Sequence, residues 1–319
     1  MASRKRNKQS VACESKIIHG DSLKKLDQLD SESVDLIVTS PPYNIGKEYE
    51  KDNKLSLDEY ISWLKPIIEK LCNVLKPNGS ICWQVGNYVK DGEVFPLDYY
   101  FYKIFIDQGF QLRNRIIWHF NFGLHADKRF SGRYETLLWF SKTCEYKFNL
   151  DPVRVPQLYP GKRHSSNKGD KAGKPSGNPL GKNPSDFWVF SSEVAFREDI
   201  LWSLPNVKSN HPEKTPHPCQ FPSELAERCV LAFTDKGDTV LDPFVGAGTS
   251  VIAAMRHGRI GVGIEKDKSY VGLARERIKA FENGTLKFRP GGKSVRTPKK
   301  GEKVSEIPQE WRDNSVAAE

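Results

Sequence analysis

Four consecutive residues, Ser40, Pro41, Pro42 and Tyr43, combine groups that suit chemistry on a planar amine. The serine hydroxyl and the Pro41 carbonyl could accept the two hydrogens of an exocyclic ring amine, which would favour a pyramidal, reactive nitrogen. The Tyr43 ring could stack on the face of a base that has been flipped out of its duplex. Alone, such a motif is more often an ordinary turn, so its interpretation depends on a second motif.

That second motif, at residues 242–249, is typical of a site for a nucleotide-type cofactor. Its two glycines let the backbone turn sharply between a strand and a helix and let a ligand lie against the main chain. Glu265 ends the next predicted strand, where a carboxylate can accept hydrogen bonds from both ribose hydroxyls. A nicotinamide dehydrogenase fits poorly, because Val251 stands where the dinucleotide fingerprint has its third glycine. The candidate cofactor-binding residues of the loop are Asp242, Pro243, Phe244, Gly246, Gly248 and Thr249.

Alternating apolar strands and amphipathic helices must position both motifs. The strand predicted at 34–39 ends at Ser40, because proline cannot donate to a ladder and biases the preceding residue away from helix. The motif is therefore expected at the carboxyl end of a strand. Further strands are predicted at 16–19, 80–85, 112–120, 134–140, 239–241 and 260–265, helices at 23–29, 57–75, 97–108, 223–233, 250–257 and 270–281, and a turn at 76–79. This alternation predicts an α/β fold with a largely parallel sheet.

The charge of the chain favours a polyanionic partner. Its 49 Lys and Arg residues exceed its 40 Asp and Glu residues, and cations that displace phosphate counterions give sequence-independent affinity for nucleic acid. Lysines and aromatic residues are scattered among Gly, Pro, Ser and Asn over 151–212, which predicts either a surface insertion without function or a region that contacts DNA. The polar segments 1–14 and 284–319 are expected to be flexible.

Other features narrow the class of protein. The six cysteines lie far apart without a zinc-site pattern, so we expect reduced thiols and no metal site. The basic N-terminus lacks the apolar stretch of a signal peptide, and no run approaches the roughly 20 apolar residues of a membrane span. These observations predict a cytoplasmic protein of a bacterial, archaeal or phage-infected cell.

In combination, Thr39-Ser40-Pro41-Pro42-Tyr43-Asn44 and the downstream loop 242–249 resemble the beta-type DNA amino-methyltransferases. In that family the catalytic motif precedes the cofactor motif and a target-recognition region separates them, which is where 151–212 lies. The segments 19–21, 133–142 and 217–222 are similar to further motifs of the family. The resemblance extends over most of residues 15–282.

The resemblance implies a circularly permuted methyltransferase sandwich with a mostly parallel seven-stranded sheet and an inserted target-recognition region. Its domains would be a catalytic half at 15–150, the target-recognition insertion at 151–212 and a cofactor-binding half at 213–283. The cofactor would be S-adenosyl-L-methionine, with Asp21 at its adenine, so that Asp21 and Glu265 would bracket the adenosine from opposite ends of the sequence. Double-stranded DNA would be the substrate of a monomer or homodimer, and a cognate restriction endonuclease would be a plausible partner.

The most specific of these expectations concerns the target base. Serine at position 40, rather than aspartate, resembles the members of the family that make N4-methylcytosine, so we expect a flipped-out cytosine, with adenine N6 as the alternative. A protein-glutamine methyltransferase is disfavoured because those enzymes resemble Asn-Pro-Pro-Tyr and carry the cofactor loop earlier in the chain. An RNA methyltransferase and a non-catalytic DNA-binding relic remain further alternatives.

Overall fold

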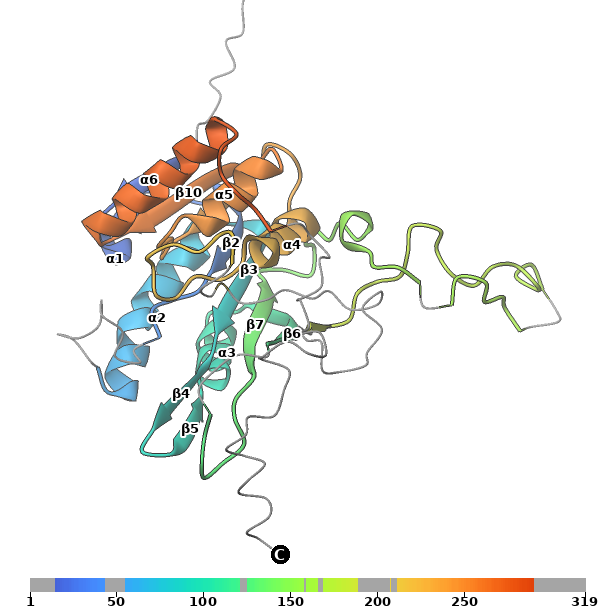
Figure 1. Ribbon diagram of the computed structural model, residues 1–319, viewed down its shortest axis with the longest axis horizontal. Helices are drawn as coiled ribbons and strands as arrows, with labels where there is room; N and C mark the ends of the chain where they lie inside the picture. The colour runs from blue at the N-terminus through green and yellow to red at the C-terminus, as the bar shows by residue number, and fades with distance from the viewer. Residues whose placement is uncertain are drawn as a thin grey trace, which may run out of the picture.

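An eight-stranded sheet forms the centre of the protein, with the strand order β1-β10-β9-β2-β3-β7-β6-β8 (Figure 1). The computed structural model describes residues 15–43, 55–120, 125–157, 159–165, 169–188, 207 and 211–289. The predicted flexible segment 1–14, most of the predicted tail 284–319 and parts of 151–212 lie outside the described residues.

The sheet is parallel except at one strand. Its members are β1 (Lys16–His19), β2 (Val34–Thr39), β3 (Leu75–Val85), β6 (Gln111–His119), β7 (Tyr134–Ser141), β8 (Phe187–Trp188), β9 (Thr239–Asp242) and β10 (Ile260–Glu265). Within the described chain, β7 alone runs against its neighbours β3 and β6, and every other pair in this sheet is parallel. The expected mostly parallel seven-stranded sheet is confirmed, and the two-residue strand β8 adds an edge to it.

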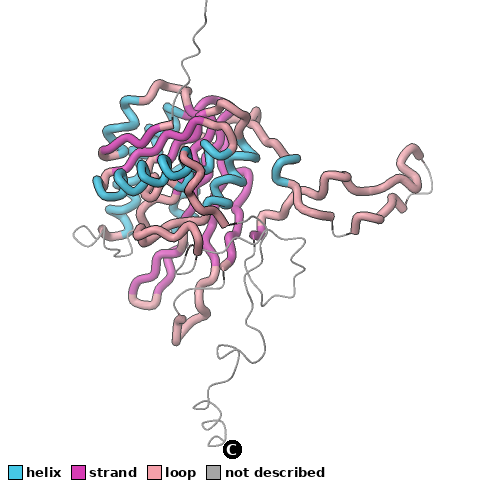
Figure 2. Tube along the Cα trace, turned by 45° about the horizontal axis from the view of Figure 1, so that its top comes forward, coloured by secondary structure: helices cyan, strands magenta, loops and turns pink. Residues whose placement is uncertain are grey.

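Helices cover both faces of the sheet and give a three-layered sandwich (Figure 2). The helices α1 (Ser22–Lys25), α2 (Leu57–Val74) and α3 (Leu97–Asp107) and the 3-10 turn η1 (Leu26–Gln28) belong to one face. The helices α4 (Ser223–Phe233), α5 (Thr249–Arg256) and α6 (Lys268–Glu282) cover the other. The expected amphipathic helices thus bury their apolar stripes against the sheet.

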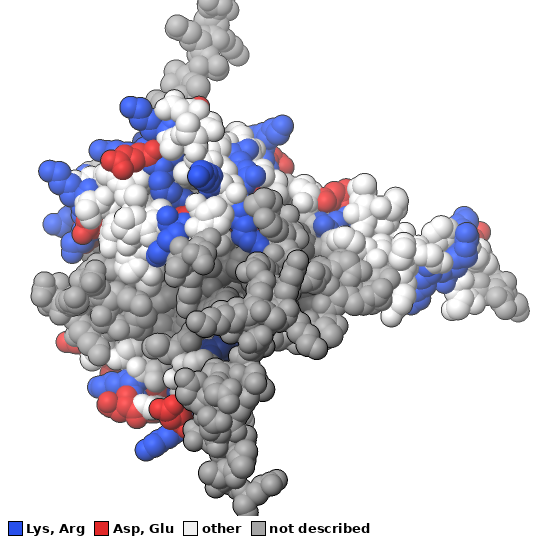
Figure 3. Space-filling model, viewed as in Figure 1, with Lys and Arg blue, Asp and Glu red and all other residues white. Residues whose placement is uncertain are grey.

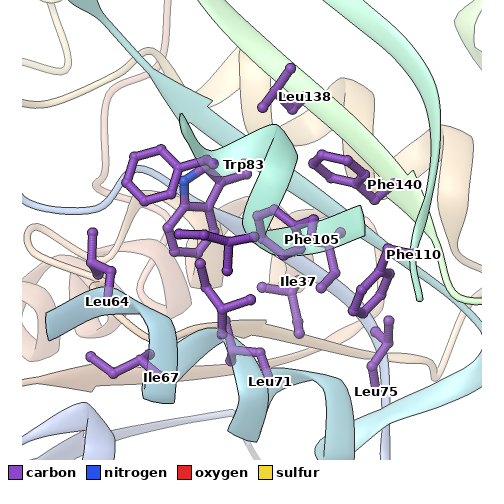
Figure 4. Close-up of a cluster of buried hydrophobic side chains, with 14 of the residues drawn as sticks. Ile37, Leu64, Ile67, Leu71, Leu75, Trp83, Phe105, Phe110, Leu138 and Phe140 are labelled. Carbon is purple, nitrogen blue, oxygen red and sulfur yellow. The ribbon is translucent and has the colours of Figure 1, made fainter. Parts of the chain in front are cut away.

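A cluster of buried hydrophobic side chains packs α2 and α3 against β2 and β3 (Figure 4). Leu64, Ile67 and Leu71 recur at helical spacing on α2 and are buried against the sheet. Trp83 of β3 lies 5.4 Å, ring centroid to ring centroid, from Phe105 of α3. Truncating such a side chain to alanine typically costs about 2–5 kcal/mol, so this core holds the ends of β2 and β3 firmly.

Three details differ from the sequence-based expectations. The predicted helix 23–29 is divided between α1 and η1. The predicted turn at 76–79 is a bulge within β3, because Val34 pairs with Leu75 whereas Leu36 pairs with Ser80. The hairpin of β4 (Asn87–Lys90) and β5 (Glu93–Pro96) was not predicted, although Asp91 and Gly92 both have positive φ, as the Asp-Gly signature of a tight hairpin turn requires.

An extended arm leaves the sandwich after the 3-10 turn η3 (Asp151–Val153). Isolated bridges join Val155 to Lys182 and Arg163 to Pro175, so the chain runs out and back along itself. Exposed cations gather toward its far end (Figure 3), and these include Lys162, Arg163, Lys171 and Lys174. None of the helices in the described chain is long and apolar enough to cross a bilayer.

Candidate active site

The predicted site residues meet at one edge of the sheet, where its parallel strands have their carboxyl ends. Ser40 follows β2, the loop 242–249 begins at the end of the neighbouring strand β9, and Glu265 ends β10. Asp21 lies just after β1, which pairs with β10. In the sheet β9 and β2 are neighbours. The chain continues from β9 to β10 on one side of this pair and from β2 to β3 on the other, so the two motifs meet at a topological switch point, where ligands of such sheets bind.

Asp242 ties the two motifs together. Its Oδ1 accepts hydrogen bonds from Thr39 Oγ1 at 2.6 Å and from the Phe244 amide at 3.0 Å, and its Oδ2 accepts one from Ser250 Oγ at 2.5 Å. Burial raises the pKa of the Asp242 carboxyl to about 6, against the effect of these hydrogen bonds. Both oxygens are thus engaged by the protein, which makes Asp242 a residue that positions the loop beside the catalytic motif.

The glycine loop has the geometry that its sequence requires. Gly246 has φ 48° and Gly248, the N-cap of α5, has φ 81°, which is the region that favours glycine. A Cβ at Gly246 would lie 2.8 Å from His217 Nε2. Arg277 of α6, which the sequence did not single out, donates to the Ala247 carbonyl and, at 3.3 Å, to Thr249 Oγ1. His217 therefore leaves no room for a side chain at position 246, and Arg277 fixes the main chain at the end of the loop.

The two predicted acids flank this loop on adjacent strands. Glu265 Oε2 accepts the Gly246 amide at 3.0 Å and Oε1 accepts the Asp267 amide at 2.8 Å, and burial raises the pKa of this carboxyl. The Gly20 amide donates to the Glu265 carbonyl at 2.8 Å, and Asp21 Oδ1 accepts the Leu23 amide at 2.9 Å. Acids from opposite ends of the sequence thus lie beside one another.

Pro243 and Phe244 attach the start of the loop to the other half of the protein. The Pro243 carbonyl accepts a hydrogen bond from Ser22 Oγ. The ring of Phe244 lies 6.0 Å from that of Trp63 on α2.

The catalytic motif is fixed by a chain of hydrogen bonds that all point the same way. Ser40 Oγ donates to Tyr43 Oη at 2.8 Å, Tyr43 Oη donates to Gln84 Oε1 at 2.7 Å, and Gln84 Nε2 donates to Glu135 Oε2. Tyr60 of α2 donates to the Pro42 carbonyl at 2.6 Å and so holds the turn from behind. Among the described residues, none donates to the Pro41 carbonyl.

Glu135 is the acceptor at the end of this chain. The residue as a whole is partly exposed, but Tyr43 and Gln84 enclose its carboxylate, and this burial raises its pKa to about 7. Burial also raises the pKa of Tyr43, and the Glu135 charge adds to that effect. Sequence reasoning assigned no role to Gln84 or Glu135. Gln84 interrupts the buried apolar run 81–85 of β3, which is a signal of a buried polar network, whereas Glu135 lies between Tyr134 and Thr136 at the start of β7 and gives no such signal.

A sequence profile of the DNA methylase family, whose members methylate N6 or N4, matches residues 34–276. This chain belongs to that family. The match spans both motifs and the interval between them, so it confirms the predicted beta-type DNA amino-methyltransferase, for which the cofactor is S-adenosyl-L-methionine.

Individual relatives agree with this assignment. The methylase is 50% identical to the type II methyltransferase M.BglII of Bacillus subtilis over 282 residues. The aligned region covers 88% of this chain and 73% of M.BglII. It is 32% identical to the DNA adenine methyltransferase YhdJ of Escherichia coli, covering 82% of each chain.

Two solved structures share its architecture. Protein TTHA0409 of Thermus thermophilus, solved in complex with S-adenosyl-L-methionine, has 28% identity and a TM-score of 0.55 and covers 84% of this chain and 94% of its own. The cytosine-N4-specific PvuII DNA methyltransferase has the same fold, with a TM-score of 0.61 at 23% identity, over 86% of this chain and 93% of its own.

The residues of this methylase fit S-adenosyl-L-methionine. The ribose carries two hydroxyl donors. The Glu265 carboxylate, with about four acceptor sites, is engaged by the backbone amides of Gly246, Lys266 and Asp267, so it keeps acceptor capacity for a ligand. Asp21 Oδ2 accepts no hydrogen bond from the described residues, and Asp21 follows the strand that pairs with the strand of Glu265. The left-handed glycines let the main chain of the loop approach a ligand closely.

Proposed function

We propose that this methylase transfers a methyl group to the exocyclic N4 amine of a flipped-out cytosine within a specific sequence of double-stranded DNA. The observation that carries the proposal is the position of the Ser40 hydroxyl. It stands at the switch point of the sheet, one residue from the Thr39–Asp242 hydrogen bond that fixes it beside the cofactor loop. A target nitrogen held there would lie between the catalytic motif and the methyl donor.

Ser40 and Pro41 act directly on the target amine. The Ser40 hydroxyl donates its hydrogen to Tyr43, so its lone pairs are left to accept one amine hydrogen, and the Pro41 carbonyl accepts the other. These bonds strengthen as positive charge develops on the nitrogen, so they stabilise the transition state more than the bound substrate. Bound S-adenosyl-L-methionine supplies an electrophilic methyl group on its sulfonium centre.

Pro42 and Tyr43 shape the pocket for the base. The Pro42 carbonyl is anchored by Tyr60, which fixes the turn, and the Tyr43 hydroxyl is anchored by Ser40 and Gln84, which fixes the plane of its ring. A ring held in one orientation can stack on the flipped base with little loss of entropy. Stacking of this kind contributes about 1–3 kcal/mol and offsets part of the free energy lost on unpairing.

Gln84 and Glu135 act through Tyr43 and Ser40 as positioning residues. Each donor in the chain points toward the Glu135 carboxylate, and an ionised final acceptor polarises the whole chain. The resulting increase of electron density on Ser40 Oγ makes it a better acceptor for the hydrogens of a developing ammonium-like nitrogen.

The cofactor is held at the other strands of the same edge. With the cofactor bound, Glu265 would accept hydrogen bonds from the ribose, Asp21 would contact the adenine, and the main chain around Gly246 and Gly248 would lie against the ligand. Pro243, Phe244 and Thr249 line this loop, and Asp242 holds it in place. The cofactor-binding half of the protein is thus the segment 213–283, and the catalytic half is 15–150.

The target-recognition region is the interval 151–212. Its arm carries exposed Lys162, Arg163, Lys171 and Lys174, which are suited to phosphate contacts. Relatives named type II methyltransferases support a role in a restriction-modification system, with a cognate endonuclease as partner and the DNA of a bacterial cytoplasm as substrate.

Serine at position 40 favours cytosine, since a neutral hydroxyl is the acceptor in place of a carboxylate. Adenine N6 is the second candidate, because the 32% identical relative YhdJ is named a DNA adenine methyltransferase. The test is to express the methylase in a bacterial host without DNA methylation and to analyse its nucleosides by mass spectrometry. N4-methylcytosine supports the proposal, N6-methyladenine replaces the base but keeps the mechanism, and the absence of both refutes DNA methylation.

A further inference from the structure

Phe130 is the most exposed large hydrophobic side chain of the described residues. It is 99% exposed, whereas the next in order, Tyr99 and Tyr159, are each 65% exposed. Single exposed hydrophobic residues are common on protein surfaces, so exposure alone assigns no role. The surroundings of this ring are what distinguish it.

The loop that carries Phe130 is basic and closed at its base. Residues 125–133 lie between β6 and β7, and the Phe120 amide donates to the Arg133 carbonyl at 2.8 Å where the two strands separate. Ser131 Oγ accepts the Ala126 amide at 3.2 Å across the loop. Lys128 and Arg129 are exposed next to Phe130. The loop therefore presents a bare aromatic ring beside cations.

This loop projects from the same edge of the sheet as the active site. β6 ends and β7 begins there, and Glu135, the second residue of β7, has its Oε2 atom 3.4 Å from Tyr43 Oη. Phe130 precedes Glu135 by only five positions, so their Cα atoms are at most roughly 17 Å apart, or about five steps of stacked bases. Figures 1 and 2 show the loop beside the β4–β5 hairpin, which extends from the same edge.

We propose that Phe130 is a wedge that enters the base stack of the DNA and stabilises the duplex from which the target base has been extruded. Apolar side chains that insert between base steps unstack them, and a ring that fills the vacated space offsets the free energy of flipping. Lys128 and Arg129 bind the flanking phosphates and hold the ring over the stack. This inference rests on the proposed placement of the target base at Ser40–Tyr43.

The test compares two synthetic duplexes that carry the recognised sequence, as read from the methylated DNA of the expression host. In one the target base is paired, and in the other it faces an abasic position, so that little unpairing is needed. Single-turnover transfer from tritiated S-adenosyl-L-methionine is measured for the full-length methylase, for Phe130→Ala and for Phe130→Trp. Ile106→Ala is the control, because Ile106 is an exposed apolar residue of α3 close to the first residue of β6, at the opposite edge of the sheet.

Phe130→Ala should slow transfer to the paired duplex roughly ten- to hundredfold, the range expected for loss of one base–aromatic stack. It should slow transfer to the abasic duplex far less, and Phe130→Trp should restore most of the rate. An unchanged rate on the paired duplex, or an equal loss on both duplexes, overturns the wedge while leaving the proposed function intact. Failure of the unaltered methylase to modify either duplex overturns the proposed function and the wedge with it.

Discussion

Replacing Glu135 with glutamine removes the charge at the end of the hydrogen-bond chain but keeps the arrangement of its hydrogen bonds. Glutamine has nearly the same shape, and its carbonyl oxygen can accept the hydrogen bond that Gln84 Nε2 now donates to the carboxylate. The variant therefore keeps Tyr43 and Ser40 in place but cannot ionise. Both the stability and the pH dependence of catalysis should change in a predictable direction.

The effect on stability follows from the raised pKa of Glu135. In the unfolded chain this carboxyl loses its proton near its ordinary pKa of 4.5, whereas in the folded protein it keeps the proton until about pH 7. Between these values the folded state binds more protons, so a rise in pH lowers the free energy of unfolding. A difference of about 2.5 pKa units corresponds to a loss of roughly 3 kcal/mol in the free energy of unfolding of the unaltered protein as the pH rises. The glutamine variant does not titrate, so it does not undergo this loss.

Urea denaturation between pH 4.5 and pH 8 measures this effect. The free energy of unfolding of Glu135→Gln, relative to the unaltered protein, should increase by up to about 3 kcal/mol across that window. Glu276→Gln, on the exposed face of α6, controls for the loss of one negative charge. Parallel pH profiles for the unaltered protein and Glu135→Gln would refute the assigned burial of the carboxylate.

The same variant tests the role of the charge in catalysis. Because the ionised carboxylate is the final acceptor of the chain, single-turnover methyl transfer by the unaltered methylase should rise with pH through about 7. Glu135→Gln should be slower above pH 7 and should lack that inflection. An inflection near 7 that persists in the variant would show that another group titrates.

Three further outcomes follow from the site. Tyr43→Ala should remove most turnover in single-turnover assays while calorimetry shows unchanged cofactor affinity. Tyr43→Phe, which keeps the ring but breaks the hydrogen-bond chain, should retain more turnover. A near-native rate for Tyr43→Ala would show that the assignment is wrong. Asp21→Ala should weaken S-adenosyl-L-methionine binding roughly tenfold or more and DNA binding little, and equal losses of both would contradict its place at the adenine. Combined Lys171→Ala and Lys174→Ala should reduce the slope of log affinity for DNA against log salt concentration by roughly 2. An unchanged slope would show that the tip of the arm does not contact phosphates.

The sequence predicted the elements of the fold well where apolar periodicity was strong. The residues of β2, α4 and β10 match their predicted ranges, because each is a buried run bounded by residues that end it. The β4–β5 hairpin was missed because it is short and most of its side chains are exposed, so only its Asp-Gly turn marks it. The bulge in β3 was taken for a turn because Pro77, Asn78 and Gly79 have the composition of one.

The position of the candidate site was predictable where single residues follow predicted strands, and not where contacts between distant strands form it. The sequence placed Ser40, Glu265 and the two glycines after predicted strands, and the structure brings these strand ends to one edge of the sheet. Glu135 could not be identified in this way, because its importance comes from β7 lying beside β3, which places its carboxylate against Gln84. The hydrogen bond that Asp242 accepts from Thr39 likewise could not be predicted, because it depends on β2 and β9 being neighbours in the sheet.

The pairing of β1 with β10 has a consequence for the synthesis of the chain. Asp21 is made 244 residues before Glu265, the other acid of the proposed cofactor site, and the hydrogen bond between Gly20 and Glu265 closes that interval. Contacts of such sequence separation form late and slowly, because the entropy of closing a long loop must be overcome first. A nascent chain therefore contains the Ser40–Tyr43 segment before it can complete the proposed cofactor site, and the Thr39–Asp242 hydrogen bond that joins the two also forms late.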